Sequence, residues 1–343
     1  MKTVKKIVAK ATFGAFALVF ILLFSACSDK KEKIVGEPIP IVRLDRDYAT
    51  YPTLSAAEQS SLFERDSTMF AAQMQVMGID NAARDEMESF CSSDVVAMFA
   101  PAVAKVFPDM KTEEQALGNI VVRAGEQGIA LPSRKYAAIV WGLPQSMVVN
   151  GDKMFIALNH YLGADHPAYE GWPEYQRRLK RRDMIPYDMA EALLAIERPY
   201  SPTDGNDNVL SRLLYEGALV HAKMQLIDNP SLANAIGVTQ AQLDDMMPNR
   251  SFMWKRLITD DMLHSSDANV MDQLFSPAPA TSIISPDAPG RAVRLIGYEI
   301  VDFWLKKNPE GKISDLLSPS FYSNPATLNQ AEYKAGEGLS EDK

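Results

Sequence analysis

The amino-acid sequence predicts an α+β fold that is mostly helical and contains one small β-sheet. Two patterns indicate this class. A hairpin signal lies at residues 147–158, where two β-rich runs flank Asn150-Gly151, a pair that accepts the positive φ angles of a tight turn. After Tyr187 the apolar residues recur mainly at helical spacing. A sheet in the first half and helices in the second half make the α+β class.

The first 26 residues have the features of a lipoprotein signal peptide. Lysines give a positive start, and residues 13–24 form an apolar run that is too short to span a bilayer as an ordinary transmembrane helix. The run ends in Phe24-Ser25-Ala26-Cys27, which resembles a bacterial lipobox. We therefore predict that residues 1–26 are removed and that Cys27 carries the lipid anchor. The alternative is an ordinary signal peptide with an incidental cysteine.

The residues after Cys27 predict a membrane location and a flexible stalk. Ser28 follows the cysteine in place of the aspartate that often retains lipoproteins in an inner membrane. This favours the outer membrane and leaves the leaflet, periplasmic or surface, open. The polar run 27–40 contains Pro38 and Pro40 and is typical of a flexible stalk.

Composition limits the function classes. Without the four lysines of the signal peptide, the chain has 31 basic against 44 acidic residues. A chain this acidic is a poor general binder of nucleic acid, because affinity for phosphate comes from Lys and Arg. If Cys27 is lipidated, only Cys91 remains, so no intrachain disulfide can form. We expect Cys91 to be a small buried residue. We also expect one domain over residues 41–335, followed by a polar tail at 336–343.

Each element of the first half has a local signal. Residues 41–48 alternate apolar and polar, which predicts a short strand. Ser55 and Glu58 predict a capping box at the start of a helix that Gly78 ends. Residues 86–107 predict one or two helices interrupted by Pro101, and Thr112 with Gln115 predicts a second capping box. With 135–141 and the hairpin, the sheet has three or four strands.

The second half predicts a series of helices. Their expected ranges are 188–197, 208–227, a helix capped by Thr239 and Gln242, 250–264 and 291–306. Gly297 costs about 1 kcal/mol inside the last of these helices, which indicates a close backbone approach. Residues 276–290 contain four prolines and predict a loop.

Six segments resemble, in order, the gliding-motility lipoprotein GldB family of Bacteroidota. The segment Met154–Gly171 resembles the family's Leu-Asp-x-Tyr-Leu-Gly segment, 214–217 its Glu-Gly helix, and 236–243 its Ile-Gly-Tyr-Thr-x-x-Gln-Leu. Trp254 fits the next helix, followed by Pro-Gly-Arg at 289–291 with 297–301, and by a C-terminal piece at 328–333. The resemblance extends from about residue 41 to residue 333.

This family is similar to a larger group of zinc peptidases, so the resemblance implies a zincin (gluzincin)-like fold, with a small sheet on the zinc helix. A zincin places two histidines at i and i+4 of that helix, and a glutamate beside the first polarises the metal-bound water. Tyr215 and Leu219 stand at the two ligand positions here, and only Glu216 remains. His221 lies about 140° from Glu216 around the helix. The third ligand would correspond to Asn249-Arg250, where a cation replaces the carboxylate.

The missing ligands predict an inactive, zincin-like pseudo-peptidase with no metal and no cofactor. Glu216 then has two interpretations. It is a buried carboxylate that needs a cationic partner, for which we expect Arg291, or it lies in a former peptidase cleft that persists as a peptide groove.

Two other groups of residues are candidates. His160 and His166 flank a Leu-Gly turn and could converge with Asp165, although a hydrogen-bonding role in a loop is the simpler interpretation. The basic run 177–182 could contact anionic headgroups or an acidic partner, or form a solvated helix face. The sequence contains no Gly-x-Ser-x-Gly, Walker A or Gly-x-Gly-x-x-Gly motif.

Together these observations predict a non-catalytic outer-membrane lipoprotein of the gliding-motility type. It would support a cell-envelope motility or secretion machine through contacts with envelope proteins. The alternatives are a zinc metallopeptidase-like hydrolase with unusual ligands and a solute-binding lipoprotein that uses a cleft between sheet and helices.

Overall fold

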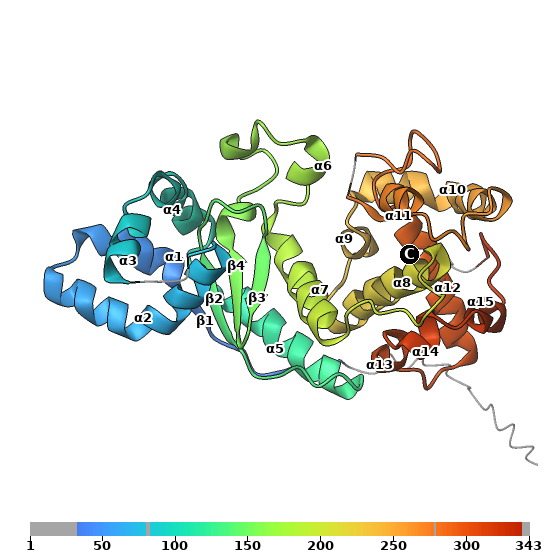
Figure 1. The fold of residues 1–343 in the computed structure, drawn as a ribbon, viewed down its shortest axis with the longest axis horizontal. Coiled ribbons are helices and arrows are strands. Elements are labelled where there is room, and N and C mark those ends of the chain that lie inside the picture. The colour runs from blue at the N-terminus through green and yellow to red at the C-terminus, as the bar shows by residue number, and fades with distance from the viewer. Residues whose placement is uncertain (1–32, 80–82, 278, 338–343) are drawn as a thin grey trace, which may run out of the picture. The chain divides into compact units, whose positions relative to one another are not determined.

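A four-stranded mixed sheet lies in the first half of the fold, in a computed structural model that describes residues 33–79, 83–277 and 279–337 (Figure 1). The strand order is β1-β2-β4-β3; β1 and β4 run parallel to β2, and β3 runs antiparallel to β4. The strands are β1 (Ile41–Arg43), β2 (Lys135–Ile139), β3 (Met147–Asn150) and β4 (Lys153–Ala157). The predicted α+β class with a small sheet is confirmed.

The predicted hairpin is present between β3 and β4. Asn150 pairs with Lys153 across the turn, and Gly151 has a φ of 59°, which a residue without Cβ adopts at no steric cost. Strand β4 is buried from Met154 to Ala157. Such a continuous apolar strand is expected where a sheet is covered on both faces.

The predicted strand at residues 41–48 is wrong beyond Arg43, because Leu44–Thr50 form helix α1. The alternating pattern also places Leu44 and Tyr48 four residues apart. Both side chains are fully buried, so the helical conformation puts the two largest apolar groups of the segment on one face toward the core.

The helices before β2 begin and end where the sequence signals predict, with two exceptions. Ser55 and Glu58 form the predicted capping box. The break between α3 and α4 lies at Ser92-Ser93, since Ser93 caps α4, and Pro101 lies inside α4. Thr112 forms no capping box, because α5 begins one residue earlier. The helices are α2 (Ala56–Val76), α3 (Arg84–Cys91), α4 (Asp94–Val106) and α5 (Lys111–Glu126).

The flexible stalk predicted for residues 27–40 is wrong over its second half. The carbonyl oxygen of Gly36 accepts a hydrogen bond from the amide of Gln115 at 2.7 Å, and the N–H of Ile39 donates to the carbonyl of Glu114. A Cβ on Gly36 would lie 2.2 Å from the carbonyl oxygen of Gly118. The chain is therefore attached to α5 from about Ile34, and the predicted signal peptide and Cys27 lie outside the described residues.

The second half of the described chain is helical. Its helices are α6 (Glu174–Arg177), α7 (Ile185–Glu197), α8 (Val209–Leu226), α9 (Leu232–Ile236), α10 (Gln240–Thr259), α11 (Ala268–Phe275), α12 (Val293–Lys307), α13 (Ile313–Leu316), α14 (Pro319–Tyr322) and α15 (Ala326–Ala331). Short 3₁₀ turns lie at Tyr51–Thr53, Leu158–His160, Pro167–Tyr169 and Arg182–Met184.

The predicted helices 188–197, 208–227 and 291–306 correspond to α7, α8 and α12, with ends that agree within three residues, whereas the prediction for α10 is wrong. Thr239 and Gln242 make the expected capping box, but the helix continues through Pro248 to Thr259. The two helices predicted for this region are therefore one. The carbonyl oxygens of Ala335 and Gly336 accept hydrogen bonds from Ser251 and Arg250, so the start of the predicted polar tail is attached to α10; residues 338–343 lie outside the described chain.

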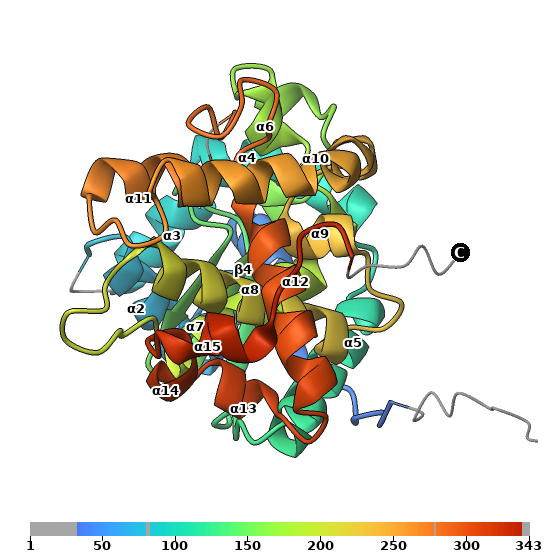
Figure 2. The same cartoon turned by 90° about the vertical axis from the view of Figure 1, so that its right-hand side faces the viewer.

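Helices α8 and α12 cross at close range (Figure 2). A Cβ on Gly217 would lie 2.2 Å from the carbonyl carbon of Gly297, and a Cβ on Gly297 would lie 2.3 Å from the carbonyl oxygen of Leu213. The close backbone approach predicted at Gly297 is confirmed. The sheet packs on α7, which lies between it and α8, whereas the zincin resemblance implied a sheet on α8 itself.

Within the described residues, no single helix has the length and apolar character that a membrane span requires, although α3 and α4, bent by 62°, meet that test as a pair.

Candidate functional site

The two positions of α8 that correspond to metal ligands hold packing side chains. Tyr215 and Leu219 are each only 3% exposed. The Tyr215 hydroxyl donates a hydrogen bond to the carbonyl oxygen of Arg198, and its ring contacts the rings of Tyr200 and Tyr322. Both positions therefore contribute to the hydrophobic core.

Glu216 is buried and lies between two arginines. Its Oε1 is 2.6 Å from Arg212 on the same helix, and its Oε2 is 2.5 Å from Arg294 on α12. Burial by itself raises the pKa of Glu216, but the charges of Arg294 and Arg212 outweigh burial and lower it. Glu216 is therefore ionised and paired at neutral pH.

A second carboxylate extends this network to α7. Glu191 contacts Arg294 at 2.9 Å and the buried ammonium of Lys223 at 2.5 Å. Burial raises the pKa of Glu191, but Arg294 and Lys223 hold it well below its usual value. The guanidinium of Arg294 thus joins carboxylates from α7 and α8. In these ion pairs each buried carboxylate has a cationic partner, as a buried charge requires.

The expected partner of Glu216 was Arg291, and this assignment is corrected to Arg294 with Arg212. Arg291 has a φ of 62° and donates a hydrogen bond to the carbonyl oxygen of Phe275. It precedes the first residue of α12, whereas Arg294 lies within the first turn and faces α8. Arg291 still lowers the pKa of Glu216 through its charge.

The remaining zincin positions have other partners. His221 stacks on Tyr298, and burial lowers its pKa to about 4. Arg250 pairs at 3.0 Å with Glu299, which also accepts a hydrogen bond from Tyr333. Within the described part of the chain, no three His, Cys, Asp or Glu side chains gather as a metal site would require.

His160 and His166 lie in different environments. The Nδ1 of His166 accepts the N–H of Ala168 at 3.3 Å, a local hydrogen bond of the kind expected in a loop. The Nδ1 of His160 lies 3.1 Å from the Ser146 hydroxyl and 3.4 Å from the Lys180 ammonium. The sequence had proposed Asp165 as the converging carboxylate; the groups at His160 are Ser146 and Lys180.

The Lys180 region forms a pocket that sequence analysis missed. The pocket has a volume of about 440 Å³, and its walls include Ser146, Trp172, Lys180 and Asp188. Lys180 donates to Ser146 at 2.9 Å and lies over the Trp172 ring at 5.1 Å. These residues are 8 to 42 positions apart and match no motif, so only the charge of the basic run 177–182 pointed toward Lys180.

The basic run 177–182 is not a single solvated helix face. Helix α6 ends at Arg177, and the cations after it point to different partners. Arg182 pairs with the buried Glu113, and Arg181 donates to Asn234.

Cys91 is buried, and burial raises the pKa of its thiol to about 12, which makes it unreactive at neutral pH.

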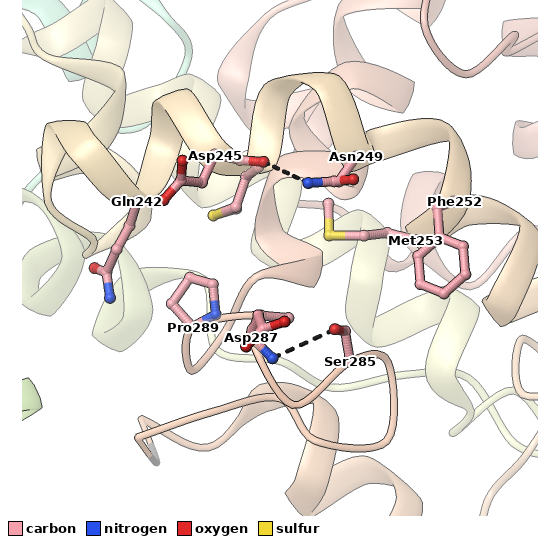
Figure 3. A pocket seen from close by; sticks show the side chains of 10 residues that line it. Gln242, Asp245, Asn249, Phe252, Met253, Ser285, Asp287 and Pro289 are labelled. Carbon is pink, nitrogen blue, oxygen red and sulfur yellow. Dashed lines mark hydrogen bonds between the residues drawn. The ribbon is translucent and has the colours of Figure 1, made fainter.

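A second pocket, of about 470 Å³, lies between α10 and the segment 285–289 (Figure 3). Asp245, Asn249 and Met253 face it from α10, and Asp287 faces them from the loop (Figure 3). Phe252 at its rim is 51% exposed. Its Met253 and Phe252 are of side-chain types that are enriched at protein contact sites, whereas Asp245 and Asp287 are of a type that is depleted there.

A family model described as gliding motility protein GldB matches residues 27–335. No curated protein matches the chain. No solved structure matches it either.

Proposed function

The chain belongs to the family of the gliding motility protein GldB, and from this premise we propose that it is a non-catalytic lipoprotein of the outer membrane. It is anchored through a lipid on Cys27 and supports a motility or secretion machine of the cell envelope through protein contacts. The motility-associated lipoprotein character comes from the family. The anchor site, the outer membrane and the lack of catalysis are parts of the proposal.

The observation that carries the non-catalytic part is the ion network around Glu216. A peptidase glutamate must face a metal-bound water, but both oxygens of Glu216 are occupied by Arg212 and Arg294. Two flanking cations would also repel a zinc ion. We propose that α8 retains the frame of a peptidase helix and uses its glutamate to hold α12.

The anchor is tested in the native host. A deletion strain is complemented with the wild-type chain or with Cys27→Ser, and colony spreading and secretion are measured. We expect the deletion to impair both processes and Cys27→Ser to fail to restore them, because a stable tether requires the acyl chains. Normal spreading and secretion in the deletion strain would contradict the envelope role.

The non-catalytic part is tested on the purified mature chain by metal analysis. We expect no stoichiometric zinc, because the ligand positions are Tyr215 and Leu219. One zinc per chain would support the metallopeptidase alternative instead. Crosslinking in cells, followed by identification of the envelope proteins that co-purify, would identify the machine.

A further inference from the structure

The pocket at Lys180 lies at the edge of the sheet where the parallel strands β2 and β4 end. Ser146 precedes β3, which begins at this same edge because it runs antiparallel to β4. Tyr161 follows β4 after one 3₁₀ turn, and Asp188 lies on α7. In sheets with parallel strands, the crevice beyond the carboxyl ends of the strands is the usual place for a small ligand.

Two opposite charges face this pocket without pairing. Lys180 and Asp188 both belong to its walls, and each affects the pKa of the other through its charge. No ion pair within 4 Å joins Lys180 to Asp188 or to another carboxylate among the described residues. The contacts of Lys180 are Ser146, His160 and the ring of Trp172.

The groups that hold Lys180 are neutral. Burial and the Lys180 charge lower the pKa of His160 to about 3, so its imidazole is uncharged at neutral pH. It donates to the carbonyl oxygen of Leu143, which leaves Nδ1 as the acceptor that faces Ser146 and Lys180. Ser146 and His160 therefore orient the ammonium but do not neutralise it.

The carboxylate of Asp188 is held in a similar way. It accepts one hydrogen bond, 2.7 Å long, from the hydroxyl of Tyr161. Burial raises the pKa of Asp188 to about 6, and burial lowers the pKa of Lys180 to about 8. Each group is less stable in its charged form than it would be in water, and each gains from an opposite charge.

We propose that this pocket binds a small zwitterion of the α-amino acid class. The carboxylate of the ligand lies at the Lys180 ammonium, and its ammonium lies at Asp188. The apolar walls, formed by Trp172, Pro144 and Leu179, receive the side chain of the ligand. The volume of about 440 Å³ is within the range of small-molecule sites.

A ligand with a single charge fits this arrangement less well. A simple carboxylate would be attracted by Lys180 but repelled by the carboxylate of Asp188. A simple amine would be attracted by Asp188 but repelled by the ammonium of Lys180. Only a molecule that carries both charges compensates both groups at once. This inference is independent of the envelope role, because the pocket is far in sequence from Cys27 and is formed by different residues from the Glu216 network.

The test uses the full mature chain purified in detergent. Its melting temperature is measured with L-leucine and L-phenylalanine, and with analogues that lack one charge. The analogues are 4-methylpentanoate and 3-phenylpropanoate, without the ammonium, and 3-methylbutylamine and 2-phenylethylamine, without the carboxylate. We expect at least one amino acid to raise the melting temperature by about 3 °C at roughly tenfold excess over its Kd, and the analogues to raise it by less than about 1 °C.

Variants locate the site. Lys180→Met and Asp188→Asn should each abolish the shift, and Trp172→Phe should remove the change in tryptophan fluorescence that accompanies binding. Lys255→Met, which changes an exposed lysine on α10, is the matched control and should leave the shift intact. The proposal is overturned if neither amino acid shifts the melting temperature, if a singly charged analogue shifts it equally, or if Lys180→Met binds as the wild type does.

Discussion

The Glu216 network and the Lys180 pocket place buried charges in opposite situations. At Glu216, carboxylates from α7 and α8 meet Arg294 at 2.5–2.9 Å, and the pKa of each carboxyl is lowered. At the pocket, Asp188 and Lys180 face one cavity without an ion pair, and burial raises the pKa of Asp188. Charges compensated by their neighbours stabilise a fold, whereas uncompensated charges beside a cavity indicate a binding site.

The largest effect is expected for Arg294→Met. This substitution removes the guanidinium that Glu191 and Glu216 share and leaves each buried carboxylate with one cation, Lys223 and Arg212 respectively. Breaking a buried ion pair by removing one partner costs about 3–5 kcal/mol. Urea unfolding monitored by circular dichroism measures the free energy of unfolding. Arg256→Met is the control, since Arg256 pairs with Asp260 near the surface and should contribute less than about 1 kcal/mol. Equal losses in both variants would show that the network is not compensated as described.

Glu216→Gln should lower the free energy of unfolding by about 1.5–3 kcal/mol at pH 7, because the charged hydrogen bond to Arg212 and the ion pair with Arg294 are lost. The folded pKa of Glu216 is below its ordinary value of 4.5. Its contribution is therefore present above pH 4.5 and disappears as the pH falls through the folded pKa. The same loss at pH 3 and pH 7 would contradict an ionised, paired Glu216.

Gly297→Ala tests the crossing of α8 and α12 that brings Arg294 to Glu216. The new methyl group would lie 2.3 Å from the carbonyl oxygen of Leu213, so the helices must separate at a cost of about 1–3 kcal/mol. The matched control is Gly125→Ala in α5, where a Cβ meets nothing within 4 Å. There the exchange should stabilise the helix by up to about 1 kcal/mol. A gain at Gly297 would contradict the close approach.

The smallest predicted effect, that of Asp188→Asn, is a gain in stability, and it distinguishes the pocket from the Glu216 network most directly. The folded pKa of Asp188 is raised from 3.8 to about 6, so its charged form costs stability above pH 6, and this cost fades as the pH falls toward 3.8. Asp188→Asn should therefore raise the free energy of unfolding by about 1 kcal/mol at pH 8 and by little at pH 4. If Asp188→Asn instead lowered the free energy of unfolding at pH 8, as Glu216→Gln is expected to do at pH 7, the charge of Asp188 would be compensated in the folded chain like that of Glu216.

The sequence by itself determined the features that depend on neighbouring residues. The Asn150-Gly151 turn, the Ser55 and Thr239 capping boxes and the α+β class depend on local conformational preference, and the structure has them. Gly297 was identified as a point of close approach for a similar reason, since a glycine inside a helix needs a packing explanation. The family resemblance depended likewise on short segments in order.

Tertiary structure decided which side chains meet. Periodicity could not show whether Arg291 or Arg294 reaches Glu216, because that depends on where α12 begins and how it crosses α8. Leu44–Thr50 became a helix because burial of Leu44 and Tyr48 outweighed the alternating pattern. The Lys180 pocket joins residues from the segment before β3, from the segment around α6 and from α7, and these residues have no common spacing. Such sites are formed by packing between distant segments, which no local pattern specifies.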